Sequence, residues 1–313
     1  MAPSALPVIL QAKTSNKHAS LIINQHHASH IADVCACIWL LPLTSVNTVT
    51  RHNLYFRNRS MQIHELWHFP VKGFGGNQMP LAKLQQGGYF PNDRQFAISI
   101  GSEKTAAALD GTWFRKAHFL QLMSHELLAE YSCRYDDATN SRLELLHQGV
   151  VCLSIDPAQP TDCQRFEDFF FTLLGSKLRG KPRLMTMKHQ AYSDQSTALI
   201  SIASSASLDA FAEATNTKPD SRRFRINIIT DGDTPFAEEA LIGTTLCCGD
   251  ALLLVKKPVG RCAAINVDPA TAKRNPEDYV CFMKAHFGHS NLGIFAEVIN
   301  GGIIRVGDRL QPA

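Results

Sequence analysis

The sequence predicts a mainly β protein with some helices (α+β), in which one β-barrel domain is followed by a second. Three observations favour this class. Short runs of alternating apolar residues are separated by turn residues, helical spacing is confined to a few stretches, and strands and helices do not alternate as in a doubly wound sheet. Apolar residues make up 45% of the chain and charged residues 19%, which suits a globular protein with a core.

Residues 1–60 are expected to be an atypical extension outside both barrels. They are rich in His, Asn, Ser and Thr, and carry five Lys or Arg against one acid, Asp33. MQIHELWHFPVKGF reads like a natural beginning, so we expect the true start at Met61, with translated upstream sequence before it. The alternative is a weak membrane anchor or poor signal sequence in ADVCACIWLLPLTSV, which is shorter than the roughly 20 residues of a membrane span, so a membrane role is not favoured.

The first barrel domain is expected over residues 61–180. MQIHELWHF leads into its first strand, and DRQFAISI is a strand with Phe96, Ile98 and Ile100 on one face. RLELLHQGVVCLSI has the pattern of a hairpin that turns near Gly149. DCQRFEDFFFTLLGSKL then shifts to helical spacing, with Gly175 placed to cap the helix.

The second barrel domain is expected over residues 181–313. A helix with a serine cap is predicted in SSASLDAFAEATN. Strands are predicted in RRFRINIITDG, LCCGDALLLVKK and GGIIRVGDRL, and the second of these holds Cys247 and Cys248 as small core residues.

Charge and cysteine content narrow the function classes. Beyond residue 60 the chain carries 26 basic and 27 acidic side chains, which leaves no electrostatic footprint for nucleic acid. The nine cysteines are irregularly spaced, and the first twenty residues lack the continuous apolar region of a secretory leader. We therefore expect mostly reduced thiols and a cytoplasmic location.

Two familiar motifs occur, one complete and one lacking its last residue, and neither is favoured as a functional site. HELWH, from His64 to His68, fits the HExxH zinc pattern, but Pro70 leaves little room for the helix that this pattern needs, so a chance match in a strand is favoured. GSKLRGKP has Pro182 where a P-loop needs Ser or Thr.

Cys262, in VKKPVGRCAAINVDP, is the main candidate for chemistry. Pro258 and Gly260 predict a loop at a strand end, and Arg261 favours the thiolate form of its neighbour. The alternative is a packed core cysteine. A thiolate is a soft ligand, and a metal that is held mainly by a cofactor needs only one protein sulfur.

Basic residues in turns are candidates for binding an anionic ligand with polar rings. They are Lys72 in FPVKGFGGN, Arg94 in PNDRQF, and Arg225 with Asn227 in RFRIN. Each alone is compatible with a solvated surface charge. The loop AYSDQS adds Ser193, Asp194 and Ser196. Its sequence is equally compatible with a helix cap and with a loop that forms hydrogen bonds to the same ligand.

Several of these stretches resemble a known family. HELWHFPVKGF followed by DRQFAI resembles the opening of the MOSC N-terminal β-barrel domain. AYSDQS, FRINIITDG, PFAEE, GRCAAINVDP and GGIIRVGDRL resemble the MOSC domain, the carboxy-terminal module of molybdenum cofactor sulfurases. The resemblance runs in order from Met61 to the carboxy terminus, and the architecture resembles that of amidoxime-reducing MOSC proteins of mitochondria and bacteria.

The resemblance implies a molybdenum cofactor, with Cys262 as the protein ligand of molybdenum and the pterin dithiolene and oxo groups as the others. It implies cofactor contacts from Lys72, Arg94, Ser196, Arg225 and Arg261, and places Asp194 near the metal as a candidate catalytic residue that organises protons. It further implies reduction of N-hydroxylated small molecules, with electrons from a separate ferredoxin-like or cytochrome b5-like protein. The alternative is a non-redox carrier of the cofactor, or of sulfur as a persulfide on Cys262.

The chain departs from the family pattern at four positions. Gly73 and Gly260 stand where relatives often have serine or a similar polar residue, Ile226 replaces the proline of FRPN, and Phe295 stands where some relatives have tyrosine. These changes bear on substrate range more than on cofactor binding.

Overall fold

The computed structural model describes residues 60–108, 110–136, 141–188 and 190–313, which all belong to one compact unit. The predictions for residues 1–59, including the apolar stretch, lie outside the described residues. Among the described helices, none has the length and apolar character needed to cross a membrane.

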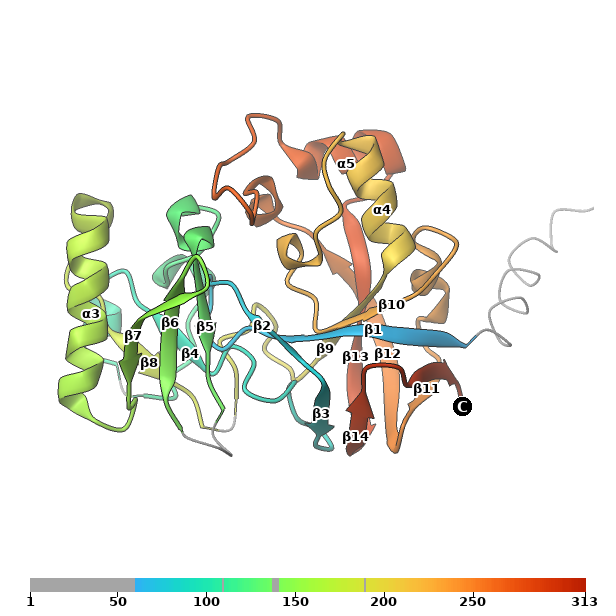
Figure 1. Cartoon of the computed structure of the whole chain (residues 1–313), viewed down its shortest axis with the longest axis horizontal. Helices are drawn as coiled ribbons and strands as arrows, with labels where there is room; N and C mark the ends of the chain where they lie inside the picture. The colour runs from blue at the N-terminus through green and yellow to red at the C-terminus, as the bar shows by residue number, and fades with distance from the viewer. Residues whose placement is uncertain (1–59, 109, 137–140, 189) are drawn as a thin grey trace, which may run out of the picture. The chain divides into compact units, whose positions relative to one another are not determined.

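Seven strands close into a barrel (Figure 1). Around the ring they are β1 (Met61–His68), β10 (Ile228–Thr230), β9 (Ile200–Ser204), β13 (Asn291–Asn300), β12 (Ala251–Gly260), β11 (Thr245–Cys248) and β15 (Arg309–Pro312), which pairs with β1 again. Alternate residues face the interior: Ala251, Leu253 and Val255 of β12 all lie in the main apolar core. The prediction of a mainly β, barrel-containing fold is confirmed.

One part of the ring differs from the expectation that strands and helices do not alternate. β9 and β10 are parallel neighbours, and α4 (Ser205–Ala214) lies between them in sequence. A parallel neighbour is not reached by a tight turn, so the chain crosses over through this helix. The predicted serine cap is confirmed, because the Ser204 hydroxyl accepts a hydrogen bond from the Ser207 amide.

The amino-terminal part of the chain contributes to the barrel directly. β1 was expected to open a separate domain, but it lies between β10 and β15, so a boundary near residue 180 does not separate the barrel strands. β1 contains HELWH as a strand, with His64 exposed and His68 buried, and the helix of a zinc motif is not formed. β2 (Asn77–Met79) extends the sheet beside β1, and β3 (Leu81–Leu84) pairs with β14 (Gly302–Arg305).

The other described strands of the amino-terminal part form small sheets. They do not form the closed barrel that was expected for residues 61–180. β4 (Phe96–Ile98) pairs with β8 (Leu184–Thr186), and β5 (Tyr131–Arg134), β6 (Leu143–His147) and β7 (Val150–Ile155) form a three-stranded sheet. The expected hairpin is present as β6 and β7, and it turns at Gly149, whose φ of 82° suits glycine.

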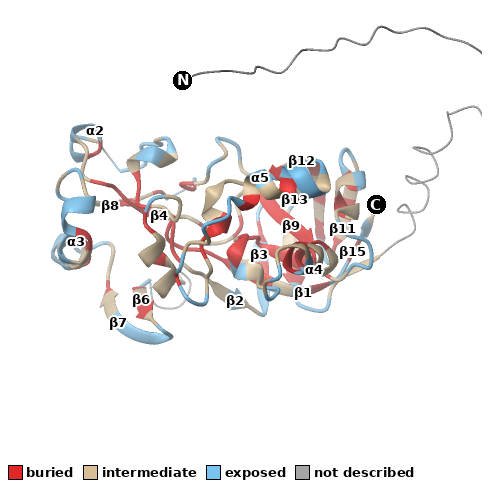
Figure 2. Ribbon diagram, turned by 90° about the horizontal axis from the view of Figure 1, so that it is seen from above, coloured by how far each residue is buried: buried red, intermediate tan, exposed pale blue. Residues whose placement is uncertain are grey.

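α3 (Pro160–Leu174) is the predicted phenylalanine-rich helix. It buries Phe166, Phe170 and Leu174 in a second apolar core and exposes its other side (Figure 2). Gly175 ends it with φ of 49°, as expected for a glycine cap. The shorter described helices are α2 (Glu103–Ala106), α5 (Tyr279–Phe287) and the 3-10 turns η1 (Lys116–His118), η2 (Glu126–Glu130), η3 (Gly175–Lys177), η4 (Ser221–Arg223), η5 (Ala237–Leu241) and η6 (Ala263–Asn266).

A chain that starts at Met61 is expected to fold as well as the full chain. β1 begins at Met61 and pairs there with Leu310, whereas Ser60 accepts only an exposed hydrogen bond from Arg309, worth at most about 1 kcal/mol. The measurements are the yield of soluble protein and its thermal midpoint. A chain that starts at Val71 is the control, because loss of β1 opens the barrel. Loss of soluble protein in the Met61 chain would contradict the expectation.

Candidate functional site

A cavity of about 370 Å³ brings together residues that are distant in sequence. Seven Lys or Arg side chains line it against two Asp. The cations are Lys72, Arg94, Lys116, Arg223, Arg225, Lys257 and Arg261, and the acids are Asp93 and Asp194. This excess of positive charge favours an anionic ligand, since a concave low-dielectric site focuses the field of its charges.

Cys262 lies in the wall of this cavity, half-buried, just beyond the last residue of β12. The predicted loop at a strand end is confirmed: Cys262 caps η6, and its carbonyl oxygen accepts a hydrogen bond from the Ile265 amide at 3.1 Å. Cys248 is fully buried in the barrel core, and burial raises the pKa of its thiol to about 12. Cys247 is half-buried and lies outside the cavity lining, and among the described cysteines Cys262 is the one that lines the cavity.

The side chain of Arg261 is held by backbone carbonyl groups. Nε donates to the Leu292 oxygen at 3.0 Å and Nη1 to the Phe224 oxygen at 2.8 Å, while Nη2 also donates to Leu292. These bonds use three of the five N–H groups of a guanidinium, so two remain for a ligand in the cavity. Burial lowers the pKa of Arg261 to about 9, so holding the charge here costs free energy that a bound anion would offset.

Arg94 and Arg225 face one aromatic ring. Their guanidinium carbons lie 5.0 and 4.7 Å from the centroid of Phe69. Both residues have left-handed backbone conformations, with φ of 51° and 54°. Such strain is uncommon outside glycine and is typical of functional sites.

Hydrogen bonds fix these two arginines in place. Arg94 donates to Asp93 and to the Arg225 carbonyl oxygen, the latter at 3.0 Å, and Arg225 donates to the Phe74 carbonyl oxygen. Burial, reinforced by the charge of Arg94, lowers the pKa of Arg225 to about 9. Asp93 and Asp194 both act on the charge of Arg225, so the two arginines favour an anionic ligand but are partly balanced by carboxylates of the same cavity.

Lys72 and Asp194 form a short ion pair at the cavity wall. The Lys72 Nζ donates to Asp194 Oδ1 at 2.6 Å and to the Tyr192 carbonyl oxygen at 2.7 Å. Burial lowers the pKa of Lys72, and Asp194 only partly opposes this. For Asp194, burial acts to raise the pKa, but Lys72, together with Lys116 and Arg94, outweighs it and the pKa is lowered. The carboxylate is therefore ionised at neutral pH, and any anionic ligand must share Lys72 with it.

Two other predicted residues have different surroundings. Asn227 lines the cavity, but its Oδ1 accepts from the amide and hydroxyl of Ser201 at 3.1 and 2.9 Å, and its Nδ2 donates to the Trp67 carbonyl oxygen. These bonds tie β9 and β1 together. Ser196 is exposed and is not among the residues that line the cavity.

The backbone at Gly73 explains why this chain has glycine there, where relatives often have a polar residue. Its φ is 89°, and a Cβ atom there would lie 2.7 Å from the Leu120 carbonyl oxygen. A serine at this position would therefore strain its own backbone, and its Cβ atom would collide with the Leu120 carbonyl oxygen. At Gly260 the nearest atom to a Cβ would be Asn291 Oδ1 at 3.9 Å, so serine would fit. The glycine after Lys72 is structurally required, whereas the glycine before Arg261 is not required by space.

Three further cations of the cavity were not predicted from the sequence. Lys257 donates to Gln195 Oε1 at 2.6 Å and lies over the Phe295 ring. Lys257 belongs to the VKKPVGRC stretch, and Arg223 lies two residues before Arg225. Both could have been found from the sequence, because they are close to predicted site residues. Lys116 lies in η1, and nothing in its sequence surroundings points to the site.

Comparisons with known proteins agree with the sequence resemblance. Residues 188–311 match the family model of the MOSC domain. A stretch of 73 residues, 23% of this chain, is 40% identical to molybdenum cofactor sulfurase of Drosophila mojavensis, and it spans only 9% of that protein.

Similar solved structures are more distant. The YUAD protein from Bacillus subtilis has a TM-score of 0.40 and 14% identity, over 80% of this chain and 94% of that one. YiiM from Geobacillus stearothermophilus has a TM-score of 0.29 and 21% identity, over 36% of this chain and 53% of that one.

Proposed function

We propose that the chain binds the molybdenum cofactor in the cavity beside Cys262, from the premise that residues 188–311 match the family model of the MOSC domain. The observation that carries the proposal is a half-buried thiol in the wall of a cavity lined by seven cations. The donor set suits the group, because a soft thiolate suits the metal and guanidinium groups suit a phosphate.

Each part of the cavity has a distinct task in this proposal. Cys262 would ligate molybdenum, and Lys72, Arg94, Arg225 and Arg261 would hold the anionic parts of the pterin. When bound, the metal supplies two-electron redox chemistry. Asp194, ionised beside Lys72, can accept a proton at neutral pH but cannot supply one, so its catalytic role is limited to that of a base or an organiser of hydrogen bonds.

The reaction that we propose is reduction of N-hydroxylated small molecules, with electrons from a separate ferredoxin-like or cytochrome b5-like protein. The sequence resemblance to amidoxime-reducing MOSC proteins supports this. The second candidate is a carrier of the cofactor or of sulfur, in which the Cys262 thiolate would take the outer sulfur of a persulfide on a separate donor protein and release the donor's thiol. The local similarity to a protein named molybdenum cofactor sulfurase favours this candidate.

The deciding experiment is expression of the full chain in a host that makes the cofactor. We expect molybdenum and pterin in amounts close to one per chain, and turnover of an amidoxime with an added electron donor. Purified protein that lacks both but carries an additional sulfur atom on Cys262 by mass spectrometry would favour the carrier. Stoichiometric cofactor without turnover would leave cofactor binding supported and reject the reductase assignment.

Replacing Lys72 or Arg94 with alanine is expected to lower cofactor occupancy without unfolding the protein. A charge-assisted hydrogen bond contributes about 1.5–3 kcal/mol, which corresponds to a loss of roughly 10- to 100-fold in affinity for each substitution. The measurement is molybdenum per chain as cofactor is titrated in. Lys256→Ala is the matched control, because Lys256 is exposed, pairs with Glu297 and does not line the cavity. Unchanged occupancy in the Lys72→Ala, Arg94→Ala double variant would show that both are ordinary structural charges.

A further inference from the structure

Arg223 is the most deeply buried arginine of the cavity. It is 5% exposed, whereas Arg94, Arg225 and Arg261 are only half-buried. Its neighbour Arg222 points to solvent and pairs with Asp220. Burying a guanidinium is costly unless its donors are all well used, so the partners of Arg223 indicate what it is for.

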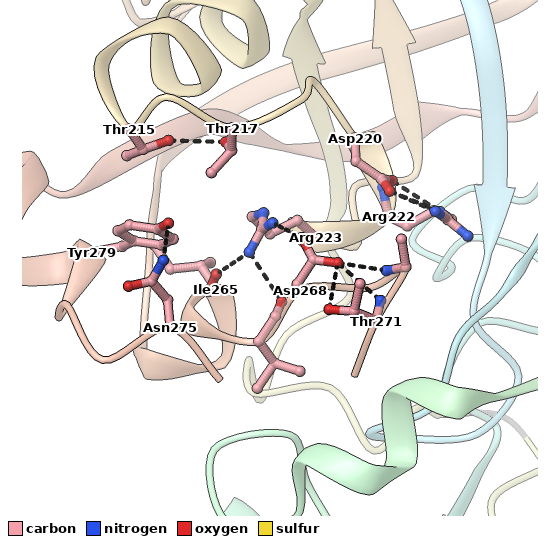
Figure 3. Close-up of polar contacts among 12 residues, drawn as sticks. Thr215, Thr217, Asp220, Arg222, Arg223, Ile265, Asp268, Thr271, Asn275 and Tyr279 are labelled. Carbon is pink, nitrogen blue, oxygen red and sulfur yellow. Dashed lines mark hydrogen bonds and ion pairs between the residues drawn. The ribbon is translucent and has the colours of Figure 1, made fainter. Parts of the chain in front are cut away.

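The guanidinium of Arg223 bridges three acceptors in the segment that follows Cys262 (Figure 3). Nη1 donates to the carbonyl oxygens of Ile265 and Val267 at 2.9 and 3.1 Å, and Nη2 donates to Asp268 Oδ2 at 2.7 Å. The planar fork of an arginine can span these acceptors at once, which the point charge of a lysine cannot.

Asp268 extends this clamp into the next turn. Its Oδ1 accepts from the amides of Ala270 and Thr271 at 2.9 and 3.0 Å and from the Thr271 hydroxyl at 3.2 Å (Figure 3). One carboxylate oxygen therefore faces Arg223 while the other closes the turn, so the position of Arg223 and the path of the backbone after Val267 are fixed together.

Ile265 links the clamp to the backbone of Cys262. The Ile265 carbonyl oxygen accepts from Arg223, and the Ile265 amide donates to the Cys262 carbonyl oxygen at 3.1 Å. η6 is one short turn, and short 3-10 turns have weak hydrogen-bond geometry of their own. Its conformation therefore depends on donors outside the turn. Arg223 bonds the Ile265 carbonyl oxygen at 2.9 Å, Arg274 bonds the Ala263 carbonyl oxygen at 3.4 Å, and the Asn275 amide bonds the Asn266 carbonyl oxygen at 2.7 Å.

We infer that Arg223 is a positioning residue for Cys262. It holds the turn from Cys262 to Asp268 in one conformation, so that the thiol stays in the cavity wall. The consequence for metal binding rests on the proposed function, but the effect on the turn does not.

Hydrogen exchange of the full chain, followed by mass spectrometry, tests this. In Arg223→Ala, peptides that cover residues 262–268 are expected to exchange at least about tenfold faster, since loss of even one charge-assisted bond corresponds to about that factor. Peptides from β12 and β13 should exchange as in the wild type. Arg222→Ala is the matched control and should change neither region.

The conservative variant separates positioning from folding. Arg223→Lys keeps the charge but reaches fewer of the three acceptors, so we expect a folded protein with a lowered thermal midpoint, faster exchange over residues 262–268, wild-type exchange in the barrel strands and a molybdenum content reduced at least about tenfold. If Arg223→Ala is insoluble, the lysine variant carries the test. Wild-type exchange over residues 262–268 in Arg223→Lys, or acceleration spread equally over the barrel strands, would overturn the inference. If the purified wild-type protein contains no molybdenum, the proposed function is rejected. The hydrogen-exchange result would still test the effect of Arg223 on the turn.

Discussion

Replacing Cys262 with serine is expected to abolish turnover of N-hydroxylated substrates and leave the fold intact. Sulfur and hydroxyl oxygen differ little in size, the side chain is half-buried beside an open cavity, and the turn is held through the backbone of Cys262. The free energy of unfolding should therefore change by no more than about 1 kcal/mol. A serine hydroxyl stays protonated at neutral pH and is a poor substitute for a soft thiolate ligand.

The measurements are molybdenum content, pterin content and turnover of the purified variant. Pterin should remain in part, because the cations of the cavity are unchanged. Cys247→Ser is the matched control, since Cys247 is half-buried like Cys262 but does not line the cavity. Cys248 is a poorer control, because a hydroxyl in the barrel core would itself destabilise the fold. Wild-type turnover in Cys262→Ser would reject the thiolate-ligand mechanism and the assignment of the site that depends on it.

Elements governed by local patterns could be predicted from the sequence. The helix ending at Gly175, the hairpin turning at Gly149 and the serine-capped helix α4 all depend on periodicity or on a turn residue within a few positions. The loop position of Cys262 is of the same kind, since Pro258 and Gly260 lie beside it.

Long-range pairing could not be predicted in this way. An alternating strand such as β1 does not reveal its partners, and the register Met61 with Leu310 joins residues at opposite ends of the described chain. The same limit applies to the site. Asn227 and Arg225 lie two residues apart in sequence, yet Asn227 turns its polar atoms to Ser201 and Trp67 while Arg225 faces Phe69 and Phe74.

Replacing Arg261 with alanine is expected to cost about 2–6 kcal/mol in the free energy of unfolding and to remove most bound cofactor. Its side chain supplies hydrogen bonds to the carbonyl groups of Leu292 and Phe224, two residues that are buried. A buried acceptor left without its donor costs about 1–3 kcal/mol. The cavity would also lose a cation next to the thiol.

Arg261→Lys distinguishes these two effects, because lysine keeps the charge but can reach only one of the two carbonyl groups. Denaturant unfolding should show an intermediate loss of stability, and cofactor occupancy should fall less than in the alanine variant. Arg134→Ala, at an exposed arginine that pairs with Glu144, controls for loss of a charge elsewhere. If Arg261→Ala unfolds at the same denaturant concentration as the wild type, the two carbonyl groups must find other donors. The hydrogen bonds by which Arg261 joins β13 to the RFRIN segment would then contribute nothing to the stability of the barrel.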